Sequence, residues 1–130
     1  MAQTLLIVED DPAIMEILKY LLADSGFNTI SSQYGEDVDE LIDLHQPELV
    51  LMDIRLGKMD GREICRNIKS HARNFKIPVI LMSAHAVAKD ILNEACADAF
   101  ISKPFDIDYV VNLINKTIEI DNITSRISKL

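Results

Sequence analysis

Charged and hydroxyl residues follow apolar runs at widely separated places in the chain. They are, in chain order, Glu9, Asp10 and Asp11 after LLIV, Asp53 after ELVLM, Ser83 after VILM, and Lys103 with Pro104 after AFIS. If the runs are parallel strands, their carboxyl ends meet at one edge of a sheet, where such folds bind their ligands. That edge would hold three aspartates, a hydroxyl and an ammonium. These are the groups needed to bind a divalent cation and a phosphoryl group.

The elements that would position these groups alternate along the chain. Apolar runs predict strands at 5–8, 27–31, 49–52, 79–82 and 99–102, and helical periodicity predicts helices at 12–22, 38–44, 64–69, 87–96 and 109–118. This alternation favours an α/β fold with a doubly wound parallel sheet and helices on both faces. We expect one domain over residues 1–118. Residues 119–130 have weaker periodicity and are interpreted as a helix extension, a linker stub or a frayed tail.

Composition limits the classes of protein to which the chain can belong. Its 130 residues suit a single core, and the hydrophobic fraction of 48% is typical of a packed globule. The net charge of −8 argues against a nucleic-acid surface, which needs clustered Lys and Arg. We therefore expect no direct contact with nucleic acid.

The cysteines and the amino terminus indicate a cytoplasmic location. Cys65 and Cys96 lie far apart in predicted helices, without metal-ligand spacing, and are expected to be buried thiols in a reducing compartment. The first apolar run is too short for a signal peptide, and no stretch approaches the ~20 apolar residues of a membrane span. We expect no membrane contact.

Four segments together resemble the receiver domain of two-component response regulators, including the chemotaxis regulators. They are LLIVEDD, LVLMDIRLGKMDG, PVILMSA and DAFISKPF, in the family's order and approximate spacing. The resemblance extends from about Thr4 to about Ile118. It implies the flavodoxin-like strand order 2-1-3-4-5, with the site beside strands 1 and 3.

The resemblance also implies a magnesium-dependent phosphorylation site. Asp53 is then the phosphoacceptor and a metal ligand, Asp11 binds Mg²⁺ directly, Asp10 binds it through water, and the backbone carbonyl of Arg55 adds another oxygen. Asp10 and Asp11 precede Pro12, so either one could also cap a helix amino terminus.

Three residues on the later strands have implied roles in catalysis and switching. Lys103 would direct its ammonium toward the phosphoryl oxygens, and its peptide bond to Pro104 resembles the family's cis bond. Ser83 would offer a hydroxyl to the same oxygens, or serve as an ordinary strand-end residue. Phe100 matches the family's switch aromatic, but it could equally be a packing residue.

Several positions differ from the family's commonest pattern. Gly57 and Lys58 stand where Pro and Gly are usual, which should loosen the turn beside the phosphoacceptor. Cys96 replaces a frequent Gly. Arg55 and His85 occupy positions that tune hydrolysis of the acyl phosphate in this family, and His85 is otherwise interpreted as a solvent-edge residue.

The expected function is a phosphoaspartate switch that requires Mg²⁺ and is not a metabolic enzyme. The phosphoryl donor would be a histidine kinase or a phosphotransfer protein, and a downstream protein would bind the face of helix 4, strand 5 and helix 5. The chain could act alone or be the receiver of a longer regulator, as a monomer or a phosphorylation-dependent dimer.

Two alternatives belong to other functional classes. A phosphorylation-independent binding module would be favoured by loss of the aspartates or Lys103, all of which are present. A phosphatase of the haloacid dehalogenase type would need Asp-x-Asp after the first strand, where this chain has adjacent aspartates.

Overall fold

The computed structural model describes residues 2–84 and 97–128, and all structural statements below concern these residues. The predicted helix at 87–96, and with it His85 and Cys96, lies outside them. Within the described ranges, no helix is both long enough and apolar enough to span a membrane.

Five parallel strands form the central sheet. They are β1 (Thr4–Val8), β2 (Asn28–Ser32), β3 (Leu49–Asp53), β6 (Val79–Ser83) and β7 (Ala99–Ser102). Their order in space is β2-β1-β3-β6-β7, and each neighbouring pair is parallel. The predicted doubly wound order 2-1-3-4-5 is therefore confirmed.

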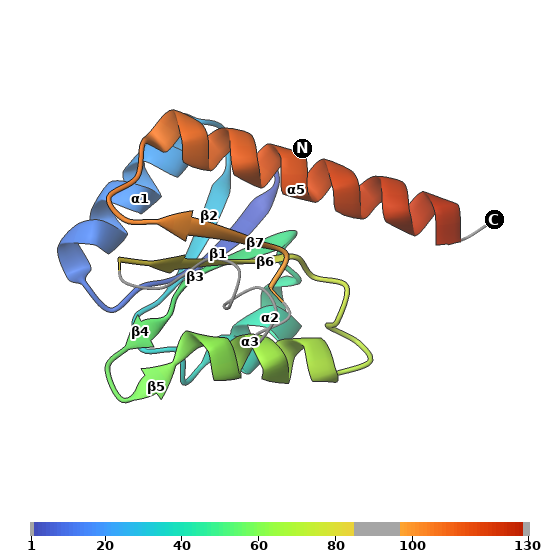
Figure 1. The fold of residues 1–130 in the computed structure, drawn as a ribbon, viewed down its shortest axis with the longest axis horizontal. Helices are drawn as coiled ribbons and strands as arrows, with labels where there is room; N and C mark the ends of the chain where they lie inside the picture. The colour runs from blue at the N-terminus through green and yellow to red at the C-terminus, as the bar shows by residue number, and fades with distance from the viewer. Residues whose placement is uncertain (1, 85–96, 129–130) are drawn as a thin grey trace.

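Helices pack on both faces of this sheet (Figure 1). Helices α1 (Pro12–Asp24) and α5 (Ile107–Ser128) lie on one face, and α2 (Val38–His45) and α3 (Gly61–Ser70) lie on the other. Because both faces are covered, the central strands are apolar at almost every position rather than at alternate ones.

The two cores follow the alternation of side chains along each strand. On β1, Leu5 and Ile7 pack with α1 and α5, whereas Leu6 and Val8 pack with α2 and α3. All four side chains are fully buried. This packing fixes the direction of each strand and therefore the position of the polar residues that follow it.

The structure differs from the predicted elements at several places, and helix α3 begins at Gly61 rather than at the predicted residue 64. The loop after β3 contains a short antiparallel hairpin, β4 (Arg55–Leu56) with β5 (Met59–Asp60). Strand β2 begins one residue later than predicted, because the backbone N–H of Phe27 still donates to the carbonyl of Leu22 at the end of α1. Of the three alternatives for residues 119–130, the structure has the helix extension, since α5 continues ten residues beyond Ile118 to Ser128.

Candidate functional site

The three acidic residues after β1 have three different environments. Glu9 is 1% exposed, Asp10 is half-buried and Asp11 is exposed. Asp11 is the N-cap of α1, and its Oδ1 accepts hydrogen bonds from the backbone N–H groups of Ala13 (2.9 Å) and Ile14 (3.3 Å). Pro12 follows it at the first helical position, where a missing N–H has no cost.

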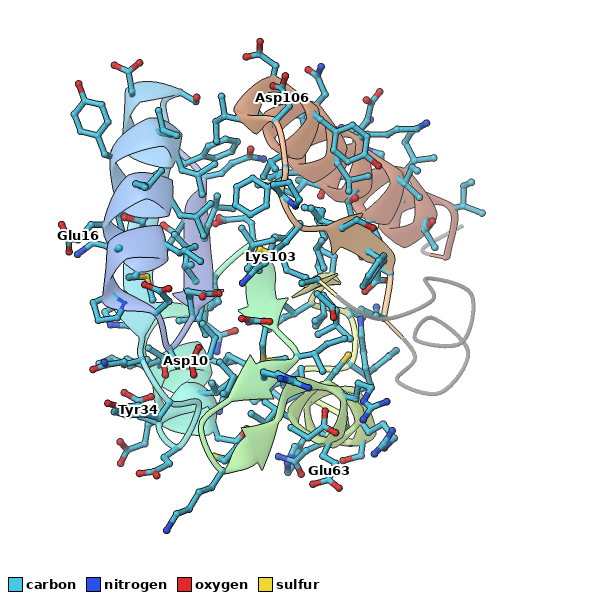
Figure 2. All side chains as sticks on the ribbon, turned by 60° about the vertical axis from the view of Figure 1, so that its left-hand side comes forward. Asp10, Glu16, Tyr34, Glu63, Lys103 and Asp106 are labelled. Atoms are coloured by element: carbon cyan, nitrogen blue, oxygen red, sulfur yellow. The ribbon has the colours of Figure 1, made fainter. Side chains whose placement is uncertain are left out.

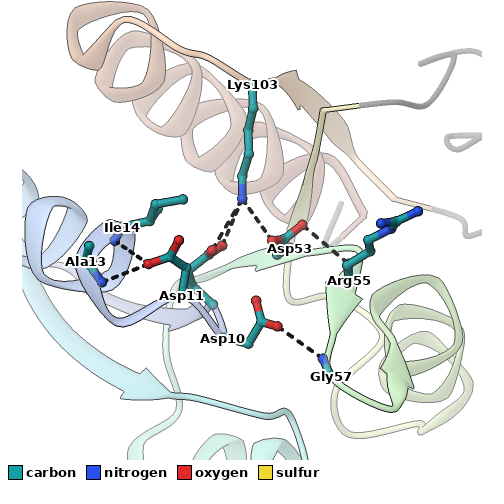
Figure 3. A network of polar contacts seen from close by, with 9 residues as sticks. Asp10, Asp11, Ala13, Ile14, Asp53, Arg55, Gly57 and Lys103 are labelled. Carbon is teal, nitrogen blue, oxygen red and sulfur yellow. Dashed lines mark hydrogen bonds and ion pairs between the residues drawn. The ribbon is translucent and has the colours of Figure 1, made fainter.

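Asp53, Glu9 and Lys103 form a connected group of charges. The Lys103 Nζ lies 2.8 Å from Asp53 Oδ2 and 3.2 Å from Glu9 Oε2 (Figure 3). Asp53 ends β3 and is 7% exposed, and Lys103 follows β7, two strands away. The parallel sheet thus brings together charges that are 94 residues apart in sequence.

This group carries more negative charge than the lysine alone can neutralise. Burial and, next, the charge of Asp53 raise the pKa of the Glu9 carboxyl to about 7, against the opposing effect of Lys103. Burial lowers the pKa of Lys103, but its hydrogen bond to Asp53 and the charge of Glu9 outweigh this effect and hold the pKa above its usual value. The site therefore favours a fixed ammonium and disfavours two bare carboxylates side by side.

Asp10 is the third acidic residue of the cluster, and the β4–β5 hairpin holds its side chain. Its Oδ2 accepts a hydrogen bond of 3.2 Å from the backbone N–H of Gly57. Gly57 has a φ of 60°, which Pro cannot adopt, and Pro would also lack the donor. The departure from the family pattern at this position thus provides a hydrogen bond to an acidic side chain of the site.

Tight backbone packing fixes the position of Asp53. The N–H of Gly61 donates to the carbonyl of Ile54 over 2.7 Å. A Cβ atom at Gly61 would lie 2.3 Å from the backbone oxygen of Asp53 and 3.0 Å from the Cα of Ile54. Only glycine allows α3 to begin so close to the end of β3.

The carboxylates provide a donor set suited to a divalent cation. One carboxylate oxygen from each of Glu9, Asp10 and Asp53 lies within 4.8 Å of the other two. Hard cations such as Mg²⁺ prefer oxygen ligands of this kind, and Asp10 and Lys103 lie at the same edge of the sheet (Figure 2). A divalent cation would offset the excess negative charge described above, so the residues fit the group.

Ser83 and Phe100 lie on the predicted strands, and Arg55 lies in the β4–β5 hairpin. Ser83 ends β6, and its carbonyl accepts the N–H of Lys103 over 3.0 Å. Phe100 is half-buried on β7 and packs against the α2/α3 core. Arg55 has an exposed side chain, while its backbone N–H donates to Asp53 Oδ1 over 3.3 Å. The Lys103–Pro104 peptide bond is cis, as predicted.

The structure brings Asp10, Asp53 and Lys103 together, but it places Asp11 in the capping role. Glu9, to which the sequence analysis gave no role, joins the cluster instead. The sequence contained a usable signal, because a Pro at the first helical position makes the residue before it the N-cap. Assigning Asp11 to the cap would have left Glu9 and Asp10 as the acidic pair of the site.

The fold and the clustered charges at the carboxyl edge of the sheet are those of a receiver domain. In agreement with this, the family model of the response regulator receiver domain matches residues 5–126. The chain therefore belongs to the response regulator receiver domain family, whose members are signalling switches of two-component systems. This membership excludes the phosphatase of the haloacid dehalogenase type.

Individual relatives support the same assignment. The heme response regulator HssR of Staphylococcus saprophyticus is 31% identical, and the match covers 93% of this chain but only 58% of HssR. The signal receiver domain of a histidine kinase from Syntrophus aciditrophicus is 31% identical, with a TM-score of 0.83 and 91% of each chain covered.

A second solved structure shares the fold at lower identity. The receiver domain of the sensor histidine kinase PA1611 from Pseudomonas aeruginosa has a TM-score of 0.83 at 22% identity, covering 92% of this chain and 99% of that domain. It holds a magnesium ion in its active-site cleft.

Proposed function

We propose that this chain is a Mg²⁺-dependent phosphoaspartate switch in which Asp53 is the phosphoacceptor. The observation that carries the proposal is the contact of Lys103 Nζ with Asp53 Oδ2 at 2.8 Å, beside the carboxylates of Glu9 and Asp10. A buried nucleophilic carboxylate with one fixed cation and a divalent-cation site is what phosphoryl transfer to aspartate requires.

We propose that Glu9, Asp10 and Asp53 hold the cation, together with the backbone carbonyl of Arg55. The geometry supports Glu9 in place of Asp11, whose Oδ1 is already engaged by two N–H groups of α1. The magnesium ion in the PA1611 receiver domain makes Mg²⁺ the first cation to test. When bound, the cation would neutralise charge on the carboxylates and on the incoming phosphoryl oxygens.

The chain's own residues would perform the transfer as follows. A carboxylate oxygen of Asp53 attacks the phosphorus of a phosphohistidine, the new O–P bond forms, and the N–P bond of the donor breaks. Lys103 stabilises the charge on the phosphoryl oxygens, and Ser83 donates its hydroxyl to one of them. The same site would later hydrolyse the acyl phosphate, with Arg55 and His85 setting the access of water.

A histidine kinase or phosphotransfer protein would supply the phosphoryl group, as in two-component systems generally. An apolar groove of about 400 Å³ lies beside Lys103 and would receive the donor; its other lining residues are Ile14, Ile17, Ala84, Pro104 and Phe105. The downstream partner would bind the face containing β7 and α5, with Phe100 transmitting the state of the site. We place these events in the cytoplasm.

The proposal is tested by phosphorylating the protein with acetyl phosphate. Incubation in Mg²⁺ should add one phosphoryl group, detected by intact-protein mass, and EDTA should prevent it. Asp53→Asn should abolish the modification because an amide is a poor nucleophile.

A matched pair of variants tests the metal assignment. Asp10→Asn should lower the apparent Mg²⁺ affinity, whereas Asp11→Asn should leave it unchanged, since Asn is as good an N-cap as Asp. If Asp11→Asn lowers the Mg²⁺ affinity and Asp10→Asn does not, then Asp11 is the metal ligand and the assignment of Glu9 and Asp10 as ligands is wrong.

A further inference from the structure

The C-terminal half of α5 exposes a row of large apolar side chains. Ile120, Ile123 and Ile127 are 55%, 47% and 64% exposed. This part of the helix projects beyond the sheet (Figure 1), so the core of the domain does not cover it. Ten helical residues standing alone in water are only marginally stable, so this segment gains most from packing against a partner.

The spacing of these residues is that of a two-helix seam. They occupy positions i, i+3 and i+7, and Leu113, half-buried, lies seven residues before Ile120. This is the a/d pattern of a heptad, with Leu113, Ile120 and Ile127 at a and Ile123 at d, while the first d position is the exposed Lys116. The seam therefore predicts a helix as the partner rather than a sheet edge or a flat surface.

Two opposite charges flank the seam on the same side. Glu119 and Arg126 are seven residues apart, both at g positions, and therefore about 10 Å apart along the helix axis. That separation is too long for an ion pair within one helix. An antiparallel second copy would place each of them beside its opposite, because antiparallel seams bring g positions together.

The register required by the charges is also the one required by the isoleucines. Pairing Glu119 with Arg126 of the second copy sets Ile120 across from Ile123 of that copy, and the reverse pairs follow by two-fold symmetry. A parallel pair would set Glu119 beside Thr124 and would use neither charge. Only the antiparallel arrangement uses both charges and pairs Ile120 with Ile123, and it sets Ile127 beside Lys116 of the second copy, whose alkyl stem covers it.

We propose that the seam of Ile120, Ile123 and Ile127 binds a second copy of this chain as an antiparallel, two-fold symmetric helix pair. The interface is isologous, so one surface serves both partners. Its area is smaller than that of a standard stable interface, so the dimer is weak and forms reversibly with concentration. The pairing does not depend on the chemistry at Asp53.

Sedimentation equilibrium from about 10 µM to about 1 mM tests the pairing, and concentration-dependent dimerisation is expected. Arg126→Glu and Glu119→Arg should each weaken the dimer about tenfold, because each creates two like-charge contacts. The double variant Glu119→Arg/Arg126→Glu should restore it. Circular dichroism checks that helix content is equal in all four proteins.

Two apolar variants locate the surface. Ile123→Asn should abolish the dimer, whereas Ile17→Asn, which removes an equally accessible isoleucine from α1, should leave it intact. A monomer at all concentrations, dimerisation lost in Ile17→Asn, or failure of the charge swap to restore association would each overturn the proposal. Single reversals without effect would point to a parallel pair and would overturn it too.

Discussion

The carboxyl edge of the sheet and the C-terminal half of α5 depart from ordinary burial in opposite directions. At the sheet edge, charged groups are buried: Glu9 is 1% exposed and Asp53 is 7% exposed. Along α5, Ile120 and Ile127 are more than half exposed. Burying charge and exposing apolar surface both cost stability, so both regions are places where function is expected.

The two regions also differ in how strongly their surroundings fix them. Strands β1 and β3, the β4–β5 hairpin and the tight contact at Gly61 position the acidic residues, whereas the end of α5 has packing on few sides. The comparison teaches that the first region is built for a small ligand with fixed geometry. The second is built for a macromolecule that completes its packing.

The largest effect on stability is expected from adding a side-chain atom at Gly61, next to the backbone of Asp53. Gly61→Ala places a Cβ 2.3 Å from the Asp53 carbonyl oxygen and should lower the free energy of unfolding by about 2–4 kcal/mol. Gly26→Ala is the control, since its φ is 98° with no atom within 4 Å, and backbone strain alone should cost about 1 kcal/mol. Urea denaturation measures both, and equal losses would contradict the tight packing at the site.

The buried charge of Glu9 should make stability depend on pH in the absence of metal. Its folded pKa of about 7 exceeds the ordinary 4.5, so the folded state binds this proton more tightly than the unfolded state does. The resulting stabilisation is fully present below pH 4.5 and is lost as the pH rises through 7. Glu9→Gln should remove this loss, becoming more stable than the parent by roughly 1–3 kcal/mol at pH 8.

Denaturation of both proteins in EDTA between pH 4.5 and 8 provides the measurement. If the two stability profiles stay parallel over this range, burial and Asp53 do not raise the pKa of Glu9.

Replacing the helix cap should separate stability from metal binding. Asp11→Ala loses the hydrogen bonds to Ala13 and Ile14 and should cost about 1 kcal/mol of stability, without changing Mg²⁺ affinity. Thermal unfolding and a Mg²⁺ titration give the two quantities. A large loss of Mg²⁺ affinity in this variant would show that Asp11 is a metal ligand.

The smallest effect is expected from the exposed seam. Ile123→Ala should change the stability of the dilute monomer by less than about 0.5 kcal/mol, because the side chain packs on little of the domain. Amide hydrogen exchange should be much faster at 120–128 than in β1 and β3, and should slow as protein concentration rises. Uniform protection of α5 in dilute protein would contradict the contrast between the two regions.

The sequence was sufficient for most of the fold because burial on both faces produces long apolar runs. The strand order followed from the family resemblance, and the cis Lys103–Pro104 bond was predicted in the same way. The β4–β5 hairpin was missed because two-residue strands leave no periodicity. The sequence left three alternatives open for 119–130, because the exposed isoleucines of α5 obscure its amphipathic pattern, and the structure has the helix extension.

At the site, the sequence predicted that Asp10, Asp53 and Lys103 follow neighbouring strand ends, whereas the structure also brings Glu9 into this cluster and places Asp11 as the cap of α1. Three consecutive acids have the same chemistry, and only their directions distinguish them. Pro12 provided the discriminating signal, since it fixes Asp11 as the cap. The hydrogen bond from Gly57 to Asp10 was not predictable, because it depends on where the hairpin lies relative to β1.

The most direct test of the central claim is to locate the phosphoryl group. The protein is phosphorylated with acetyl phosphate in Mg²⁺ and reduced with borohydride, which converts an aspartyl phosphate to homoserine, and the position is identified by tandem mass spectrometry. The account predicts homoserine at position 53 and nowhere else. Homoserine at another aspartate, or phosphorylation that leaves Asp53 unreduced, would contradict it.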